Sequence, residues 1–410
     1  MDNITHSLVG ALTAETALSV LKIRKPEFQI TRKTKIVFWL SALIANNICD
    51  LDFVISFVLK PSRLQYLLHH RGHTHTVLLL LFQAGLIFFG FWIWTKLKKV
   101  SWEKEEILGV VGLTLVGGVL HLVLDFLNQY GVHPFWPFYS GWFFADIMFI
   151  VEPSLWMTLI PFLFYSGSHR YFRLLLVSLL GAGLALEWFT GFVPKAIAIG
   201  MTIWSLFLMW GFRSWSKKTQ LVVCYASLGL IGLLFSLESF WLKQEIKKLF
   251  FKEQPDIAVN DVILSPFPSN PICWQVVTVV TSKNRKTFSL RKGVVSLFTN
   301  LYRPSECLEL ISKTVKVSQT HPQVIWTTQF NLDRRELIKL HQTNCFVAAQ
   351  LRFVRAPFWY RRDGKLYFAD LRFETESRDN FSKLEIPETT TDCPKLIPPW
   401  SEPRRDLLSN

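Results

Sequence analysis

The sequence predicts an α-helical membrane protein with about eight transmembrane helices, followed by a small β-rich domain of mixed α and β structure outside the membrane. Of its 410 residues, 50% are hydrophobic, including 16 Trp and 35 Phe, which is too apolar for a soluble protein of this length. Almost all long uncharged runs lie before residue 243. Residues 243–386 instead show short alternating runs bounded by turn residues, the pattern of β-strands.

Eight segments offer the roughly 20 apolar residues that a bilayer-spanning helix needs. They are residues 4–21, 36–58, 76–95, 106–127, 145–165, 171–189, 193–212 and 219–242. We divide the chain into a transmembrane domain that carries the polar residues (1–165), additional transmembrane helices (166–242), the β-rich domain (243–386) and a Pro- and Ser-rich tail expected to be flexible (387–410).

Loop charges predict the orientation of these spans. The loops after spans one, three, five and seven hold fifteen basic residues: Lys22, Arg24, Lys25, Arg32, Lys33, Lys35, Lys96, Lys98, Lys99, Lys104, Arg170, Arg173, Arg213, Lys217 and Lys218. The intervening loops hold four: Lys60, Arg63, Arg71 and Lys195. Because basic loops stay in the cytoplasm, both termini and the β-rich domain are expected outside it. The net charge of +14 is thus assigned to orientation, and no nucleic-acid partner is expected.

The β-rich domain has identifiable elements and four cysteines. Residues 272–280 and 286–290 predict a hairpin, 346–354 and 366–373 predict strands, and 305–318 and 333–341 predict short helices. On an oxidising side of the membrane, Cys273, Cys307, Cys345 and Cys393 are expected to form at least one disulfide. The sequence leaves their pairing open.

Ionisable residues gather at the outer ends of the predicted spans. Seven of the ten histidines lie on this face: His6, His69, His70, His73, His75, His121 and His133. The acids on the same face are Asp50, Asp52, Asp125, Asp146 and Glu152. Because ionisable groups in membranes are costly, such convergence indicates a polar site.

The spacing of these residues favours metal binding. His121 and Asp125, four residues apart, share one helical face with β-carbons about 5–6 Å apart. Asp50 and Asp52 can both face one site only if the helix ends between or near them, which the upstream pair Asn46-Asn47 favours. Ligands of this type suit a divalent metal, with zinc favoured over manganese or iron, and their number would allow one to three ions.

The motifs resemble the YdjM-like family of bacterial inner-membrane, metal-dependent hydrolases over about residues 1–155. The matching residues are Met1-Asp2 to Thr5-His6, Asp50-Leu51-Asp52, His70 to His75, His121 to Asp125, Tyr130-Gly131, Asp146 and Glu152-Pro153. Family members more often have Asp-Pro where this chain has Glu152-Pro153. The resemblance implies a location in the bacterial inner (cytoplasmic) membrane and a metal-dependent hydrolytic activity.

The order of histidines and acids is also similar to that in the trinuclear zinc phospholipase C and P1-nuclease group, which implies phosphoester chemistry. The full set of predicted ligands is His6, Asp50, Asp52, His70, His75, His121, Asp125, His133, Asp146 and Glu152. Arg71 and His73 are the predicted catalytic residues, Arg71 because its planar fork suits an anionic oxygen.

We therefore expect a metal-dependent hydrolase that acts on a membrane lipid, a lipid-linked substrate or an envelope phosphoester. Two alternatives remain open at this stage. The same residues could line the path of a divalent-cation or proton transporter, although the inner halves of the spans hold few ionisable groups, Glu15 being the clearest. A structural protein that anchors the β-rich domain would leave the histidine cluster unexplained.

Overall fold

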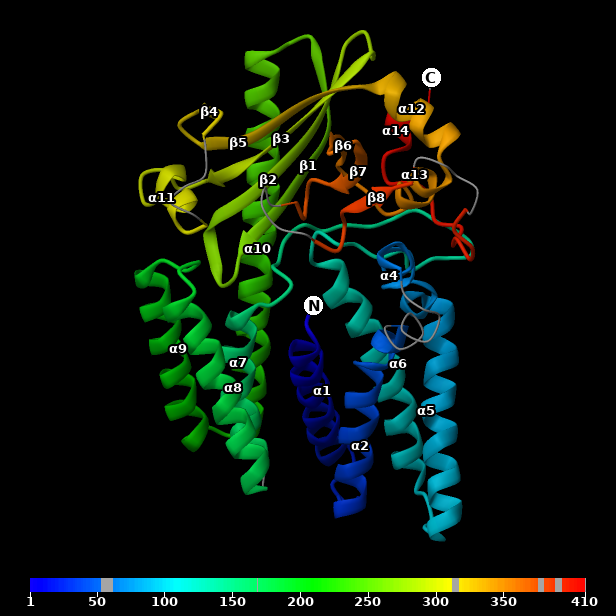
Figure 1. Cartoon of the computed structure of the whole chain (residues 1–410). Coiled ribbons are helices and arrows are strands. Elements are labelled where there is room, and N and C mark those ends of the chain that lie inside the picture. Colours follow the sequence, from blue (N-terminus) through cyan, green and yellow to red (C-terminus); the bar gives the residue numbers. More distant parts are fainter. Residues whose placement is uncertain (53–61, 168, 312–316, 375–379, 388–392, 410) are drawn as a thin grey trace.

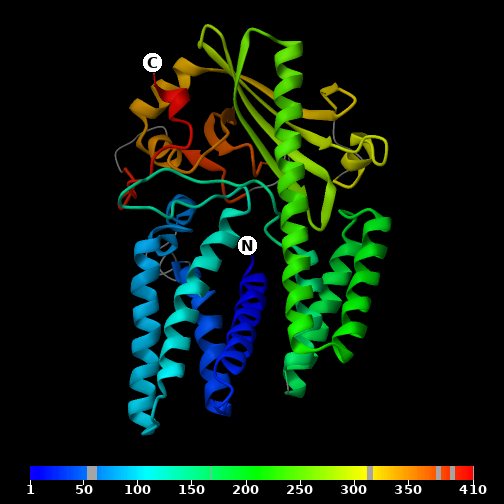
Figure 2. The same cartoon turned by 180° about the vertical axis from the view of Figure 1, so that it is seen from behind.

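Helices form a bundle at one end of the molecule, and a β-rich domain covers the other end (Figure 1). The computed structural model describes residues 1–52, 62–167, 169–311, 317–374, 380–387 and 393–409. The first residue lies where the two parts meet. Figure 2 shows that the last helix of the bundle continues upward along the β-rich domain and joins the two parts.

Six helices in the described residues are long and apolar enough to cross a membrane. They are α1 (Asn3–Arg24), α5 (Val77–Lys98), α6 (Lys104–Phe126), α8 (Arg170–Phe189), α9 (Lys195–Ser214) and α10 (Lys217–Glu253). At 1.5 Å per residue, the 37 residues of α10 span roughly 55 Å, more than the hydrocarbon core of about 30 Å. The helix therefore extends beyond the bilayer as a stem for the β-rich domain.

The structure does not confirm the expected count of about eight spanning helices. The predicted span 36–58 is represented by α2 (Arg32–Ala45), which stops where the side-chain amides of Asn46 and Asn47 donate to the carbonyls of Ala42 and Leu43 at 2.9 and 2.8 Å. Residues 53–58 of that span lie outside the described residues.

The predicted span 145–165 is also shorter as a helix in the structure. Its helix α7 begins only at Pro153 and ends at Ser166. Residues 145–152 are irregular, and Asp146 adopts a positive φ of 59°, which no helix accommodates. This short start leaves Asp146 and its neighbours free to contact the β-rich domain.

Short elements connect the helices at the end near the β-rich domain. They are the 3₁₀-helix η1 (Ile48–Leu51), helix α4 (Arg63–His69) and the 3₁₀-helix η2 (His73–His75). The basic ends of α1 and α5 and the basic starts of α2, α8 and α10 lie at the opposite end of the bundle (Figure 1).

The β-rich domain contains two antiparallel sheets. The larger has the order β1-β2-β3-β5-β4, and the smaller has the order β6-β7-β8. Its strands are β1 (Ile257–Phe267), β2 (Asn270–Ser282), β3 (Thr287–Ser296), β4 (Gln319–Thr320), β5 (Val324–Asp333), β6 (Pro357–Arg362), β7 (Lys365–Asp370) and β8 (Leu384–Ile386). Its short helices are α11 (Pro304–Glu309), α12 (Arg334–Thr343), α13 (Cys345–Gln350) and α14 (Arg405–Leu408).

Most local predictions for this domain hold. The hairpin is β2 and β3, with Thr281 opposite Phe288, and the strand expected at 366–373 is β7. Helices α11 and α12 lie within or beside the expected ranges, although residues 312–316 are outside the described residues. The strand expected at 346–354 is wrong. The side chain of Asn344 accepts hydrogen bonds from the backbone of Phe346 and Val347 and so starts α13 instead.

The C-terminal segment is packed rather than free over residues 393–409. The side chain of Trp400 is 1% exposed, and its indole nitrogen donates to the carbonyl of Leu68 at 2.9 Å. A disulfide between Cys345 and Cys393 attaches the segment to α13. The expectation of a flexible tail therefore fails over these residues, because Trp400 holds the segment against the membrane part and the disulfide holds it against the β-rich domain.

An ion-pair network centred on Arg355 joins the two parts of the molecule. The Arg355 guanidinium binds Asp146 through two bonds of 2.8 and 2.9 Å and Asp261 of β1 at 2.7 Å. Lys243 of α10 reaches Asp146 at 2.9 Å. Burial would raise the pKa of Asp261, but the charges of Arg355 and Arg404 outweigh it and lower that pKa to about 2. The network keeps its charge at neutral pH and fixes the β-rich domain over the bundle.

We predict that protein purified without reductant and then denatured has two reactive thiols, and six after reduction. The reason is that Cys273 pairs with Cys307 and Cys345 with Cys393, whereas Cys49 and Cys224 are free. The measurement is a maleimide count by mass spectrometry. Six reactive thiols before reduction would contradict the pairing.

Candidate metal centre

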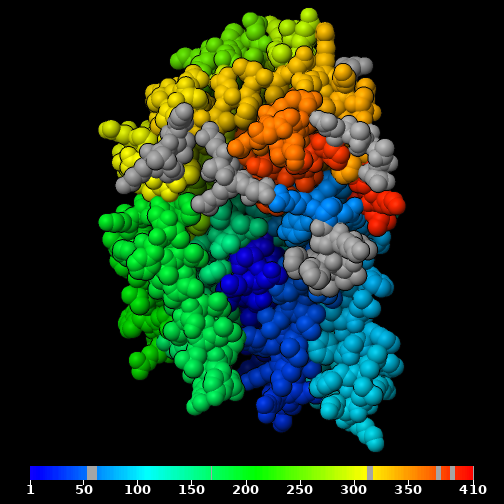
Figure 3. Space-filling model, in the orientation of Figure 1, coloured from blue at the N-terminus to red at the C-terminus, as the bar shows by residue number. Residues whose placement is uncertain are grey.

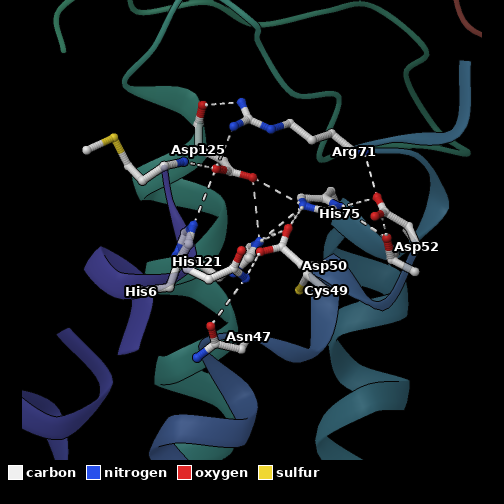
Figure 4. Close-up of polar contacts among 12 residues, drawn as sticks. His6, Asn47, Cys49, Asp50, Asp52, Arg71, His75, His121 and Asp125 are labelled. Carbon is white, nitrogen blue, oxygen red and sulfur yellow. Dashed lines mark hydrogen bonds and ion pairs between the residues drawn. The ribbon is translucent and has the colours of Figure 1, made fainter. Parts of the chain in front are cut away.

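Four side chains converge at the end of the bundle nearest the β-rich domain: Asp50, His75, His121 and Asp125 (Figure 4). One ligand atom from each lies within 4.8 Å of all the others. The Nε2 atom of His75 is 3.1 Å from Nε2 of His121 and 3.1 Å from Oδ2 of Asp125. These four residues, called the His/Asp cluster below, form a group that could hold a metal ion.

The two ligands on α6 owe their position to close packing against α2. His121 and Asp125 are one turn apart on the same face, as the sequence predicts. At Gly117, one turn before His121, a Cβ atom would lie 2.7 Å from the Cβ of Ala45. Glycine therefore lets the end of α2 approach α6, and the chain after α2 enters the site.

The ending of α2 supplies Asp50. After Asn46 and Asn47 stop the helix, η1 turns the chain, so that Oδ1 of Asp50 lies 3.4 Å from Nε2 of His75 and 3.5 Å from Nε2 of His121. Asp52 follows on the other side of the His75 ring. This geometry explains how two aspartates two residues apart come close to one imidazole.

Groups behind the two imidazoles fix their orientation. The Nδ1 atom of His121 lies 2.7 Å from the carbonyl oxygen of Asn46, an acceptor, so Nδ1 carries a proton and Nε2 is the nitrogen that faces the other members of the cluster. The Nδ1 atom of His75 lies 3.4 Å from Oδ2 of Asp52. Such carboxylate or carbonyl partners are typical of metal-bound histidines. Asp52 is therefore an orienting partner of His75 in this arrangement, not a member of the four.

Asp52 is itself held by its neighbours. Its Oδ2 accepts a hydrogen bond of 2.7 Å from the backbone of Arg71, and its Oδ1 lies 3.4 Å from Nδ1 of His70. The predicted ligand His70 thus lies behind Asp52 and stacks on Tyr66 at 5.0 Å between ring centroids. The structure brings His70 near the His/Asp cluster but not into it.

The buried Arg71 side chain holds Asp125. Its Nη2 is 2.9 Å from Oδ1 of Asp125, and its Nη1 donates to the Asp125 carbonyl at 3.1 Å and to Oδ1 of Asn128 at 3.0 Å. The guanidinium also lies over the ring of Tyr130, 4.8 Å from its centre. Sequence reasoning assigned Arg71 to a substrate oxyanion. Here both terminal nitrogens already bind protein groups.

His6 lies beside the His/Asp cluster on α1. Its ring stacks on that of His121, with 4.0 Å between centroids, and its Nε2 is 3.4 Å from Oδ1 of Asp125. The Met1 amino group contacts the same oxygen. Both His6 nitrogens are buried without a hydrogen-bond partner in the described part of the chain.

Two other predicted histidines belong to an aromatic layer above the cluster. The ring of His133 lies against Trp400 at 3.7 Å and against Trp142 at 4.6 Å, while His73 contacts Trp136 and Trp400. Burial and the nearby histidines lower the pKa of His133 to about 3, which keeps it neutral. The structure does not bring His73 or His133 into the His/Asp cluster.

The two remaining predicted ligands lie elsewhere. Asp146 is bound by Arg355 and Lys243, as described above. Glu152 caps α7 and accepts hydrogen bonds from Ser154 Oγ at 2.7 Å and from the backbone of Ser269 at 2.9 Å. Both acids are thus engaged in fixing the β-rich domain over the bundle.

Sequence reasoning missed three residues that shape the site. Arg355 and Trp400 come from the region beyond the membrane helices, where no motif marks them, and only the fold brings them to the membrane part. Asn46 was noted as a helix breaker, but its carbonyl bond to His121 depends on backbone geometry. A search for aromatic residues near the C-terminus could have singled out Trp400, but not its position.

Comparison with known proteins agrees with the resemblance seen in the motifs. Residues 1–192 match the family described as the YdjM inner membrane protein. No curated protein and no solved structure matches the chain. The family match includes all four residues of the His/Asp cluster, whereas α9, α10 and the β-rich domain lie beyond it. Residues 1–192, slightly less than half of the chain, are therefore similar to the YdjM inner membrane protein family.

Proposed function

We propose that this protein is a metal-dependent hydrolase whose His/Asp cluster lies at the extracytoplasmic face of the inner membrane and acts on the phosphoester of a membrane lipid or lipid-linked molecule. The observation that carries the proposal is the convergence of four ligand atoms from three separate segments. Side chains on η1, η2 and α6, which lie apart in the sequence, bring these nitrogen and oxygen atoms to one place, the arrangement that a bound cation requires.

The donor set fits such an ion. With Nδ1 of His121 bound to a carbonyl and Nδ1 of His75 facing Asp52, the two Nε2 atoms face each other across 3.1 Å. Two carboxylate oxygens approach the same space. Positive charge must lie between these four donors, and one metal cation can bind all of them at once. Three aspartates lie at or beside the cluster, and the guanidinium of Arg71 and the amino group of Met1 face them, which leaves negative charge that a divalent ion would neutralise.

The spacing favours zinc. A tetrahedral ion with bonds of roughly 2.0–2.1 Å has ligand–ligand distances of about 3.3–3.4 Å. Four of the ligand pairs here are separated by 3.1, 3.1, 3.4 and 3.5 Å. Manganese and iron stay as alternatives, since they accept the same nitrogen and oxygen donors. A second or third metal ion would need further ligands, and His6 or His70 would have to move to supply them.

The residues around the cluster would have distinct roles in hydrolysis. A bound divalent ion would supply an activated water and polarise the phosphoryl group. Arg71 keeps the Asp125 carboxylate in position, and Asp52 and Asn46 orient the two imidazoles. Hydrolysis consumes one water and breaks one P–O bond, with the water proton passing to the leaving oxygen. His6, whose ring nitrogens are buried and make no hydrogen bond in the described residues, is available to join the ligands or to relay that proton to the leaving oxygen.

Charge and cysteine pairing support the extracytoplasmic location. The basic loops gather at the end of the bundle away from the His/Asp cluster, which by the positive-inside rule is the cytoplasmic end. The β-rich domain, on the same side as the cluster, contains two disulfides, and disulfides persist outside the cytoplasm. Both arguments agree, although they use different residues.

A cation transporter has less support. A path to the other face would need free ionisable groups deeper in the bundle. Glu15 is paired with Lys217 at 2.8 Å, and Glu106 with Lys33 at 2.5 Å. These pairs neutralise two of the acids within the bundle among the described residues.

Our first functional prediction is that His121→Ala removes bound metal while the protein still inserts and folds, because a side chain that would bind the metal directly is lost from a helix that accepts alanine. Asp52→Asn should retain the full metal stoichiometry at saturation but lower affinity about 10–100-fold, as loss of an orienting partner does. The measurements are metal content by mass spectrometry and chelator competition.

The matched control is His321→Ala, which removes a histidine of the β-rich domain and should change neither quantity. Hydrolysis of bis(p-nitrophenyl) phosphate should fall with metal content across the series. If wild-type protein purified without chelator holds no more zinc, manganese or iron than His121→Ala, the metallohydrolase proposal is wrong.

The second prediction concerns topology. Cysteines introduced at Phe138, which is 90% exposed, and at Lys283, which is 77% exposed, should react with an impermeant maleimide added to whole cells whose outer membrane is permeabilised. One at Lys98 should not react until the inner membrane is broken. Phe138 is preferable to Gly131 in the same loop, because Gly131 has a φ of 87° and a Cβ there would meet Phe144 at 2.3 Å. Labelling of Lys98 alone would place the cluster in the cytoplasm.

A further inference from the structure

An apolar groove of about 1240 Å³ runs along the bundle between α1 and α2 on one side and α7 and α8 on the other. Figure 3 shows the separation between these two groups of helices below the N-terminal residues. Its walls include Leu8, Leu18, Leu43, Leu176 and Leu179. Since these helices lie within the membrane, the natural occupant of such a surface is hydrocarbon.

The groove is longer than one leaflet of a bilayer. It extends along α1 from Asn3 to Lys22, which at 1.5 Å per residue is about 28 Å. The hydrocarbon core of a bilayer is about 30 Å thick, so one leaflet provides about half of that. The volume also exceeds the roughly 300–1,000 Å³ of sites for drug-sized ligands. A single long chain matches these dimensions better than the paired chains of an ordinary phospholipid.

One end of the groove meets the His/Asp cluster. The groove residue Asn3 donates a hydrogen bond of 2.7 Å to Oδ2 of Asp50, and Ser7 exchanges hydrogen bonds with Asn47. The side chain of Asp50 is 20% exposed, whereas those of His75, His121 and Asp125 are 0–1% exposed. The accessible side of the cluster is thus the side of Asp50, next to the groove.

The middle of the groove carries one charge that is already neutralised. Glu15 binds Lys217 at 2.8 Å and accepts a hydrogen bond from the indole of Trp39 at 2.9 Å. At the far end lie Lys22, Lys35 and His169. An apolar chain can therefore pass Glu15, and the groove is open to a headgroup at either end. Lys22 and Lys35 can attract an anionic headgroup, but only the end at the His/Asp cluster offers metal ligands that would support hydrolysis, so we place the phosphoester there.

We propose that this groove holds the hydrocarbon chain of a polyisoprenyl phosphoester, with the phosphoester against the Asp50 side of the His/Asp cluster and the chain end near Lys22. The proposal rests on the proposed function and names its substrate class. It gives a role to the groove residue Asn3, whose hydrogen bond to Asp50 connects the groove to the His/Asp cluster. Specificity for a long single chain follows from the length of α1 rather than from any headgroup contact.

The test is photocrosslinking in nanodiscs with a long-chain polyprenyl phosphate that carries a diazirine at the chain end. The crosslinked residues are mapped by mass spectrometry. We expect labels on groove residues near Pro26 and Phe28, and competition by unlabelled polyprenyl phosphate. Labels near Asn3 and Ser7 would mean the reverse orientation and overturn the proposal. Equal labelling by a phosphatidic acid probe with a diazirine at its acyl end would overturn the choice of chain.

A matched pair of variants on α8 tests occupancy of the groove. Leu179→Trp fills it, whereas Leu174→Trp changes a residue that is 60% exposed and does not line it. We expect labelling to fall roughly tenfold in Leu179→Trp, the effect of displacing about two buried methylene groups, and to stay unchanged in Leu174→Trp. Leu175→Trp, which also lines the groove, replaces Leu179→Trp if that variant does not fold. Unchanged labelling in a folded groove variant overturns the proposal.

The same labelling is measured in His121→Ala, which tests binding apart from hydrolysis. We expect it to persist there, because the chain and not the metal supplies most of the contact. Loss of metal and hydrolysis with retained labelling separates the two proposals. If the wild type binds metal but is not labelled, the hydrolase proposal is unaffected, and the proposal that the groove is its substrate site is wrong.

Discussion

The ion pair between Asp125 and Arg71 is the interaction on which the rest of the membrane part depends. Both side chains are almost fully buried, with 1% and 2% exposure. A carboxylate and a guanidinium in a buried membrane site are stable only when paired and hydrogen-bonded. Arg71 satisfies this by binding Asp125 through both its side chain and its carbonyl, together with Asn128. With one carboxylate oxygen engaged in this way, the other faces His75 and His121.

The β-rich domain closes the site from above through charges and aromatic rings. Arg355 holds Asp146 from the membrane part and Asp261 from β1 at once, so the domain cannot shift without breaking three ion contacts. Trp400 covers His133 and reaches the backbone of Leu68 at the end of α4. These contacts exclude bulk water from the top of the cluster. They also leave the side facing the membrane, next to Asp50, as its accessible side among the described residues.

A water-shielded cluster that opens toward hydrocarbon suits a substrate that never leaves the membrane. Low local dielectric strengthens the attraction between an ion and the four ligands, and it raises the cost of leaving those ligands without one. The apolar groove beside α1 meets the same accessible side. In the proposed function, the helical bundle, the His/Asp cluster and the β-rich domain therefore act together on a substrate that reaches the site from the bilayer.

Composition and periodicity determine the parts of the fold that depend on local physics. Long apolar runs must form helices in a membrane, because their backbone groups find no other partners. The basic loops mark one end of the bundle, and alternating runs mark the β2–β3 hairpin. The sequence fails where a short polar signal overrides a longer pattern. Asn46 and Asn47 end α2, and Asn344 starts α13 where a strand was expected. Asp146 lies outside the helix expected there and binds Arg355.

The candidate site divides in the same way. Spacing alone relates His121 to Asp125, because four residues make one helical turn. The motifs identified Asp50, Asp52, His70 and His75 as candidate ligands. They could not tell which of these bind a metal directly, because the path of the chain between the motifs sets the distances among the side chains. Only the tertiary structure separates the four converging ligands from Asp52, His70 and Arg71 behind them. It does so because burial allows only a few charged groups to share one space, and each must face a partner of opposite charge.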